Sequence, residues 1–275
     1  MNEHFSYLFS DIALTLMRHF IDRSTLFAFD LDGTLAPIAK RPSGIGIPNT
    51  IKNELSLLNE QATVAVITGR SRTDALSYLN FSPTYVVGNH GAEGLPEWKK
   101  KEKAFARTAR HWQRQLDLLL PIETRNGIVI ENKGTTLSIH YRQAQHARES
   151  HLLIISAINC LIPKPRRIGG KYIENLMPQD APDKGIALIA LMKRAGCVKG
   201  FFVGDDITDE DVFRIRNENL FTVRVGRSPK SQARFYLRSQ SEISRLLQTI
   251  NNSLKKSQKK IPAPIRLLSG QNKLS

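Results

Sequence analysis

The sequence predicts an α/β protein whose core is a parallel sheet with helices on both faces and whose middle contains an inserted, smaller α+β module. Short apolar runs alternate with helical patterns over most of the chain, which is typical of parallel strands joined by helical crossovers. The runs are almost continuously apolar, as strands are when both faces of a sheet are covered. In the middle of the chain this order gives way to long helices and an alternating hairpin pattern.

The first part of the core is expected to occupy residues 1–96. Apolar residues recur at helical spacing at Ile51, Leu55 and Leu58, whereas 63–67 is a β-branched run. By the same criteria we expect strands at 25–31, 63–67 and 84–87, and helices at 49–59 and 73–79. Because ligands of such sheets bind at the carboxyl ends of the strands, the residues that follow these strands are candidates for a site.

The inserted module is expected to occupy residues 97–180. Polar and apolar residues alternate on both sides of Asn132-Lys133-Gly134, which supplies the chemistry of a hairpin turn. We expect two helices at 107–120 and 147–161, a hairpin at 127–141 and a further strand at 171–176. Helices and antiparallel strands in this order indicate a separate α+β cap domain.

The second part of the core is expected at residues 181–254, and a basic tail at 255–275. Periodicity predicts helices at 185–195 and 210–218 and strands at 201–203 and 221–225. The tail contains Pro262 and Pro264 and is expected to be loosely ordered.

The chain of 275 residues is strongly basic, with 40 Lys and Arg against 25 Asp and Glu and a formal charge of +15. Such a charge raises the question of a nucleic-acid partner. However, the basic residues are spread over three groups, and no zinc-finger spacing or RNA-binding aromatic motif accompanies them. A solvated surface and the attraction of a small anionic substrate are the alternatives. A nucleic-acid partner is therefore not expected.

The sequence also suggests the compartment. Cys160 and Cys197 lie in apolar segments and are expected to be reduced and buried. Glu3 and Asp11 interrupt the N-terminal apolar residues, unlike a signal peptide. No apolar run approaches the ~20 residues of a membrane span. We therefore expect a cytoplasmic protein with no membrane partner.

Two pairs of aspartates follow predicted strands. Asp30 and Asp32 end the first apolar run, and Asp205 and Asp206 end the run at 201–203. Carboxylates gathered from two strand ends repel one another unless a cation lies between them. Oxygen ligands suit Mg²⁺, which also binds phosphate oxygens. The four aspartates therefore predict a Mg²⁺ site that places a metal, a phosphate and a nucleophilic carboxylate together.

The first pair has the spacing that phosphoryl transfer needs. Residues two apart on a strand point to the same side, about 6–7 Å apart, so Asp30 and Asp32 can act on one group. One carboxylate can attack phosphorus, and the second can protonate the leaving oxygen and later activate water. Thr68 and Lys184 are the candidates for stabilising the phosphoryl group.

This set resembles the haloacid-dehalogenase (HAD) superfamily of phosphatases. The resemblance covers four motifs in order, which are Asp30-Leu31-Asp32-Gly33-Thr34, Thr68-Gly69-Arg70, Lys184-Gly185 and Gly204-Asp205-Asp206. It implies a HAD-like, Rossmannoid core. It further implies that Asp30 is the nucleophile, that Asp32 is the general acid and base, and that Thr68 and Lys184 hold the phosphoryl group. Asp30, the main-chain carbonyl of Asp32, and Asp205 would bind Mg²⁺. Asp206 would support Lys184 or a metal-bound water. We expect Arg70 to pair with a carboxylate at the sheet edge instead of contacting a ligand, so it is not counted among the site residues.

More specific segments resemble the trehalose-6-phosphate phosphatase family, from about Leu26 to Leu247. These segments are 32–38, 88–93, 131–134 with 140–142, and 204–213. The resemblance implies hydrolysis of trehalose 6-phosphate and a pathway link to trehalose-6-phosphate synthase. It places a set of residues near the substrate, namely Gly69, His90, Glu131, Lys133, His140, Arg142 and Glu174.

The cap residues suit a sugar, because carboxylates and amines bind hydroxyl groups in fixed directions. Alternation places Glu131 and Lys133 on one face of the hairpin, and His140 and Arg142 on one face. Solvated strand faces with a salt bridge are the alternative explanation, and His90 can also be an ordinary turn residue. The family usually has an acid followed closely by Arg-Pro or Lys-Pro, whereas Glu174 is separated from Pro178 by Asn175-Leu176-Met177.

Other functions remain open from the sequence. A phosphatase for another sugar phosphate, of the sucrose- or mannosylglycerate-phosphate type, would keep the core motifs and change the cap residues. A non-catalytic regulatory protein would keep the fold and lose the nucleophile or the metal site, but Asp30, Asp32, Lys184 and Asp205 are present. A hinge between core and cap is expected near Pro96 and Pro178, since closure would exclude water from the site.

Overall fold

The computed structural model describes residues 6–39 and 44–258, and it contains two separate sheets. Within the described residues the larger sheet has seven strands in the order β1-β11-β10-β9-β2-β3-β4, and every neighbouring pair is parallel. The strands are β1 (Ser6–Tyr7), β2 (Leu26–Phe29), β3 (Thr63–Ile67), β4 (Tyr85–Val87), β9 (Gly200–Gly204), β10 (Leu220–Val225) and β11 (Phe235–Leu237). The parallel sheet that the sequence predicts is therefore confirmed.

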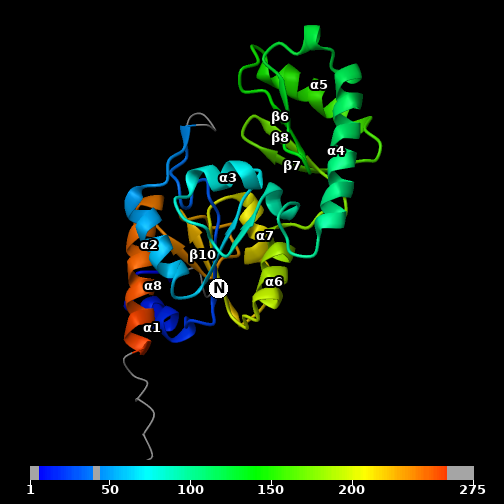
Figure 1. Cartoon of the computed structure of the whole chain (residues 1–275). Helices are drawn as coiled ribbons and strands as arrows, with labels where there is room; N and C mark the ends of the chain where they lie inside the picture. The colour runs from blue at the N-terminus through cyan, green and yellow to red at the C-terminus, as the bar shows by residue number, and fades with distance from the viewer. Residues whose placement is uncertain (1–5, 40–43, 259–275) are drawn as a thin grey trace, which may run out of the picture.

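Helices cover both faces of this sheet (Figure 1). Helices α1, α2 and α8 lie on one face, and α6 and α7 lie on the other. The core helices are α1 (Asp11–Phe20), α2 (Asn49–Asn59), α3 (Arg72–Tyr78), α6 (Lys184–Ala195), α7 (Glu210–Phe213) and α8 (Ile243–Gln258). Short 3-10 helices are η2 (Asn89–Gly91), η3 (Ile122–Thr124), η4 (Ile207–Asp209) and η5 (Gln240–Glu242). Each face has its own apolar cluster, and β2 contributes alternate side chains to the two, as a doubly covered strand must.

The inserted cap is an antiparallel sheet with two helices, as expected, and it stands apart from the core in Figure 1. Its elements are α4 (Lys99–Leu119), β5 (Val129–Asn132), β6 (Leu137–His140), α5 (Ala147–Asn159), β7 (Arg166–Gly170) and β8 (Ile173–Met177). The sheet order is β5-β6-β8-β7. One face of this sheet packs Leu137, Ile139 and Leu176 against α4 and α5, around the fully buried Trp112. The domain boundaries at 96/97 and 180/181 stay a prediction.

Several elements differ from the sequence prediction. Helix α4 begins at Lys99 instead of residue 107. The sequence prediction missed its first turns because they are lysine-rich and carry little apolar periodicity. Glu102 anchors these turns by accepting from the Gly94 amide at 2.8 Å. Helix α7 ends at Phe213 instead of residue 218. There the Asn217 side chain accepts from the Asn219 amide, and this local turn competes with the helix.

Other elements had no clear signal in the sequence. The prediction omitted α1, α8 and the strands β1, β7 and β11, since the strands are short or, in β7, contain two glycines. The expectation of a loose tail from residue 255 is wrong as far as residue 258, because α8 continues to Gln258. Residues 259–275 lie outside the described residues. In the described residues no helix is both long and apolar enough to span a membrane.

The cysteine prediction is half right. Cys160 and Cys197 are both free thiols, as expected. Their predicted burial is wrong, because Cys160 is exposed and Cys197 is half-buried. Cys160 caps the C-terminus of α5, outside the stripe of Ile154, Ala157 and Ile158 that packs onto the cap sheet.

The burial of Trp112 predicts how strongly the stability of the cap depends on its apolar core. Its ring is fully buried and its Nε1 donates to the Pro163 carbonyl at 2.6 Å. Trp112→Ala should lower the free energy of unfolding by about 3–5 kcal/mol, through lost burial and a cavity. Leu118 on the same helix is 81% exposed, so Leu118→Ala should change it by less than about 0.5 kcal/mol. Urea unfolding followed by circular dichroism measures both, and equal losses would contradict this account of the cap.

Candidate active site

The predicted site residues follow three adjacent strands at the carboxyl edge of the core sheet. Strand β2 pairs with β9 on one side and β3 on the other, so Asp30, Asp205 and Thr68 emerge side by side. The Asp30 amide donates to the Val203 carbonyl at 2.9 Å, which fixes the first strand end against β9. This is the edge at which ligands of open parallel sheets bind.

Lys184 lies buried between two of the carboxylates. It is the first residue of α6, whose N-terminus is fixed by the Asp183 side chain accepting from the Ile186 amide at 2.8 Å. Its Nζ donates to Asp30 Oδ1 and to Asp209 Oδ1, each at 2.7 Å, and only 2% of its side chain is exposed. Burial alone would lower the pKa of Lys184, but Asp209 and Asp30 raise it, so the ammonium stays charged.

Asp209 has the role that the sequence analysis gave to Asp206. Asp209 is completely buried, and its Oδ2 accepts from the main-chain amides of Asp205 and Asp206 at 2.8 and 2.9 Å. The Asp206 side chain is exposed, and the described contacts of Lys184 do not include it. Of the two roles predicted for Asp206, the support of Lys184 is therefore wrong, and the support of a metal-bound water stays a prediction. The chain turns into η4 after Asp205, and this turn carries residue 209, four positions later, back beneath Lys184.

Three carboxylates gather at this point. Asp30, Asp205 and Asp209 each offer an oxygen within 4.8 Å of the others. Burial raises the pKa of Asp205 to about 7, with Asp209 adding to the effect. Burial also raises the pKa of Asp30, against the opposing effect of Lys184. One ammonium therefore faces three carboxylates, and the excess negative charge favours a further cation.

Gly33 allows the two strand ends to approach. Its φ of 84° lies in the left-handed region, and its amide donates to the Ala36 carbonyl at 2.8 Å. A Cβ placed there would lie 2.1 Å from Asp205 Oδ2. Any side chain at residue 33 would thus displace the Asp205 carboxylate from the cluster.

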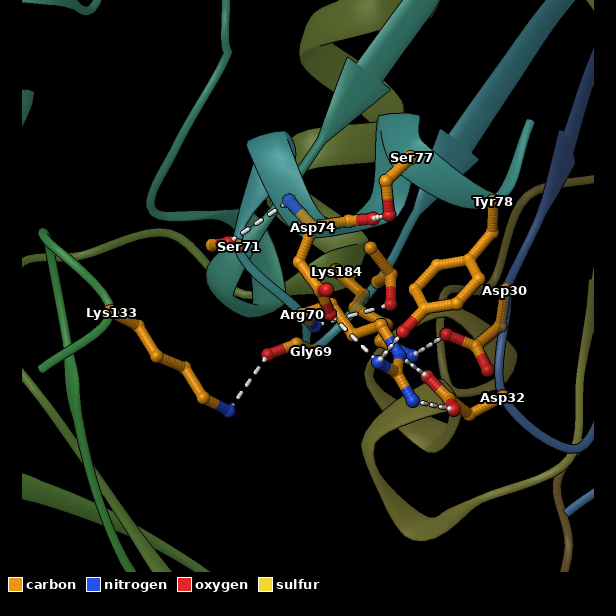
Figure 2. A network of polar contacts seen from close by, with 11 residues as sticks. Asp30, Asp32, Gly69, Arg70, Ser71, Asp74, Ser77, Tyr78, Lys133 and Lys184 are labelled. Atoms are coloured by element: carbon orange, nitrogen blue, oxygen red, sulfur yellow. Dashed lines mark hydrogen bonds and ion pairs between the residues drawn. The ribbon is translucent and has the colours of Figure 1, made fainter. Parts of the chain in front are cut away.

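Asp32 is held by Arg70 (Figure 2). Arg70 Nε donates to Asp32 Oδ2 and Nη2 donates to Asp32 Oδ1, both at 2.7 Å, while Nη1 binds Asp74 on α3. The guanidinium also lies 5.0 Å from the centre of the Tyr78 ring. Burial would lower the pKa of Arg70, but Asp32 and Asp74 raise it. The expectation that Arg70 pairs with a carboxylate is confirmed, and its partner is the predicted acid and base.

His90 lies against the loop that follows β3. A Cβ on Gly69 would lie 2.4 Å from the His90 ring, so Gly69 leaves room for it, and the His90 amide donates to the Thr68 carbonyl at 2.9 Å. Burial, together with Lys184, Lys133 and Arg166, holds the pKa of His90 well below its usual value. The structure therefore brings Thr68, Gly69 and His90 together beside the carboxylates.

Asn89 joins the core to the cap, a role that the sequence analysis did not assign. Its side chain is fully buried and donates to the Lys133 carbonyl at 2.9 Å and to Thr135 Oγ1 at 3.0 Å. It also accepts from Thr136 Oγ1 at 3.0 Å and binds Glu93. The sequence contained a signal for this role, because Asn89 directly precedes His90, the residue of this segment that the sequence analysis selected.

The hairpin of the cap brings Glu131, Lys133 and His140 to one side. Glu131 Oε2 and His140 Nε2 are 2.8 Å apart, and this contact lowers the pKa of Glu131. Lys133 extends from the hairpin turn to the Gly69 carbonyl, 3.4 Å from its Nζ (Figure 2). Burial lowers the pKa of Lys133, while Glu131 raises it. Glu131 and Lys133 therefore share a face of the hairpin, as the alternation in the sequence predicts, and Lys133 reaches the core.

Of the two remaining cap residues, Glu174 lies elsewhere, and the role of Arg142 stays a prediction. Arg142 follows the end of β6 that is farther from the hairpin turn, beyond His140. Glu174 pairs in the ladder with Ile139, so its side chain lies on the helix-covered face, where His151 at 2.8 Å and Arg167 at 3.2 Å bind it. The expectation that Glu174 contacts a sugar is therefore wrong. The neighbouring Asn175 is the residue that faces the same side as Ser138 and His140.

The comparisons with known proteins agree with this geometry. The trehalose-phosphatase family model matches residues 28–241. The trehalose-6-phosphate phosphatase of Escherichia coli K12 is 30% identical over 233 residues, covering 82% of this chain and 86% of the relative. Trehalose-phosphate phosphatase B of Arabidopsis thaliana is 27% identical over 241 residues, covering 80% of this chain. The match spans only 64% of the Arabidopsis protein.

A solved structure supports the fold. The C-terminal domain of trehalose-6-phosphate phosphatase from Candida albicans aligns with a TM-score of 0.67 at 20% identity, over 92% of this chain and 99% of that domain. This likeness includes both the parallel-sheet core and the antiparallel cap. Together with the buried lysine and its carboxylates at the carboxyl edge of the sheet, these matches show that the chain belongs to the trehalose-phosphatase family.

Proposed function

We propose that this protein is a Mg²⁺-dependent phosphatase that hydrolyses trehalose 6-phosphate to trehalose and phosphate through an aspartyl-phosphate intermediate. The observation that carries the proposal is Lys184, buried between Asp30 and Asp209 at the edge of the core sheet. A charged lysine beside a nucleophilic carboxylate has the arrangement needed to neutralise a phosphoryl group. Membership of the trehalose-phosphatase family supports the choice of sugar.

Asp30 is the proposed nucleophile. Its carboxylate would form a bond to phosphorus while the bond from phosphorus to the sugar oxygen breaks. Lys184 holds Oδ1 of Asp30 at 2.7 Å, so Oδ2 is the oxygen outside this ion pair and the proposed attacking atom. Thr68, completely buried beside it, is proposed to bind the phosphoryl oxygens through its hydroxyl.

Asp32 is the proposed general acid and base. It would give a proton to the departing sugar oxygen, and then take one from the water that hydrolyses the aspartyl phosphate. Both of its oxygens accept from Arg70 in this structure. Acid catalysis therefore requires that at least one of these two bonds opens when substrate binds.

A magnesium ion fits the carboxylate cluster. Asp30, Asp205 and the main-chain carbonyl of Asp32 are the proposed ligands, and oxygen-only donors with excess negative charge suit Mg²⁺. Among the described residues both oxygens of Asp209 already have partners, so we assign Asp209 to positioning Lys184 and the loop at 205–206. The ion would neutralise charge on the transferring phosphoryl group.

The first experiment measures phosphate release from a panel of sugar phosphates with Mg²⁺ and with EDTA. We expect a preference for trehalose 6-phosphate that EDTA abolishes. Asp30→Asn should reduce turnover by more than about 10³-fold, since it removes the nucleophile, while its circular-dichroism spectrum stays that of the folded wild type. Metal-dependent release from another sugar phosphate would reject trehalose 6-phosphate and keep the mechanism. No release from any substrate would reject the proposed activity.

The raised pKa of Asp205 predicts a pH-dependent stability without metal. Its pKa is about 7 in the folded protein and near 3.8 when unfolded, so the folded state binds the proton more tightly and loses stability as pH rises between these values. Asp205→Asn removes this loss. In EDTA, the free energy of unfolding of Asp205→Asn, relative to that of the wild type, should increase by on the order of 1–3 kcal/mol from pH 5 to pH 8.

Denaturant unfolding at several pH values measures this difference, with Asp180→Asn as the matched control, because the Asp180 side chain is exposed and does not contribute to the raised pKa of Asp205. The control should show no such trend. Mg²⁺ should stabilise the wild type and the control more than Asp205→Asn. A difference between wild type and Asp205→Asn that stays constant with pH would contradict the assignment.

A further inference from the structure

Arg166 lies on the face of the cap sheet that bears the proposed sugar-binding residues. In the ladder between β7 and β8 it stands opposite Met177, while Ile168 stands opposite Asn175. Since alternate residues share a face, Arg166 lies on the same side as Asn175 and Ser138. Its neighbour Arg167 points to the other side, where it binds Glu174.

The position of Arg166 along its strand brings it to the core. Arg166 is the first residue of β7, and its Nη2 donates to the Pro182 carbonyl at 3.3 Å in the segment that returns to the core. A Cβ on Gly91 would lie 2.9 Å from that same carbonyl, so the Pro182 segment packs on the loop that carries His90. Among the described residues, Nη2 is the guanidinium nitrogen with a hydrogen-bond partner, and the other donors are left for a ligand.

His90 has the complementary feature. Its Nδ1 is buried and has no hydrogen-bond partner among the described residues. Lys133 lies in the hairpin turn between β5 and β6, and Arg166 lies on β7 at the opposite edge of the cap sheet. Burial and Lys184 lower the pKa of His90 most, and Lys133 and Arg166 add to the effect. A buried ring nitrogen without a partner is costly, and a ligand that supplies one would remove the cost.

The strongest charges at the phosphoryl position come from other residues. Lys184 donates to Asp30 and Asp209 at the carboxyl edge of the core sheet. Arg166 belongs to the cap sheet, and its described hydrogen bonds are to Met177 Sδ and to the Pro182 carbonyl. The group that Arg166 would bind is therefore the sugar next to the phosphate and not the phosphate itself.

We propose that Arg166 is a specificity-determining residue, which binds hydroxyl oxygens of the sugar ring against His90 from the edge strand of the cap. This inference rests on the proposed function and adds a residue to its substrate site. A guanidinium presents several donors in a fixed plane, and a sugar ring presents several acceptor oxygens to match them. Met177 stands opposite Arg166 in the ladder and is apolar. Arg166 is therefore the cation of this pair on the open face of the cap sheet.

The test compares Arg166→Gln with the matched control Arg167→Gln on trehalose 6-phosphate and on a small aryl phosphate. For Arg166→Gln we expect KM for the sugar phosphate to rise roughly 10- to 100-fold, the cost of one charged hydrogen-bonding group. Its kcat, and its use of the aryl phosphate, should change by less than about threefold. Arg167→Gln should behave as wild type on both substrates, and Arg166→Lys should recover part of the lost affinity.

Each outcome decides the inference. Equal losses on both substrates would overturn it and indicate that Arg166 only holds the cap on the core. Similar effects of Arg166→Gln and Arg167→Gln, or wild-type kinetics of Arg166→Gln, would also overturn it while leaving the proposed function standing. A wild-type protein that hydrolyses the aryl phosphate but no sugar phosphate would overturn the proposed function and this inference together.

Discussion

The buried ion pairs of Lys184 are the interaction on which the site depends. A lysine that is 2% exposed keeps its charge only because Asp30 and Asp209 lie 2.7 Å away. The fold meets this requirement with three separate elements, which are the end of β2, the start of α6 and the turn after β9. Because the sheet is parallel, all three meet at one edge. Because Asp205 is a third carboxylate beside one ammonium, the cluster has more negative than positive charge and favours a cation.

In the proposed function, the chemistry and the recognition of substrate come from different parts of the chain. The carboxylates and Lys184 belong to the core, whereas Glu131, Lys133 and His140 belong to the cap. Asn89 connects the two parts through hydrogen bonds to the hairpin turn. This contact places the hairpin over the strand ends without adding charge to the reacting centre. Under this proposal, changes on the open face of the cap sheet would alter the preferred sugar while the core mechanism stays the same.

Periodicity and strand-end chemistry predicted much of this arrangement. The strands at 63–67 and the helix at 49–59 have the bounds expected from apolar spacing, and Asp30, Thr68 and Asp205 meet where parallel strands end. Asp209 was missed because it reaches Lys184 through a tight turn whose path the residue order does not reveal. Glu174 was misplaced because the face of a strand depends on register, and a shift of one residue exchanges Glu174 for Asn175. Arg166 lies in a glycine-containing strand that has no apolar pattern, so only the ladder to β8 places it.

The pair between Arg70 and Asp32 connects the acid and base to substrate binding. Two bonds of 2.7 Å hold both Asp32 oxygens, and Asp74 and Tyr78 fix the guanidinium from α3 (Figure 2). A carboxylate bound in this way cannot donate a proton to a leaving oxygen. In the proposed reaction, a hydroxyl-rich substrate must compete with Arg70 for Asp32 before the proton can move. Water alone competes poorly with a bidentate guanidinium, so Asp32 stays bound to Arg70 until a sugar phosphate reaches it.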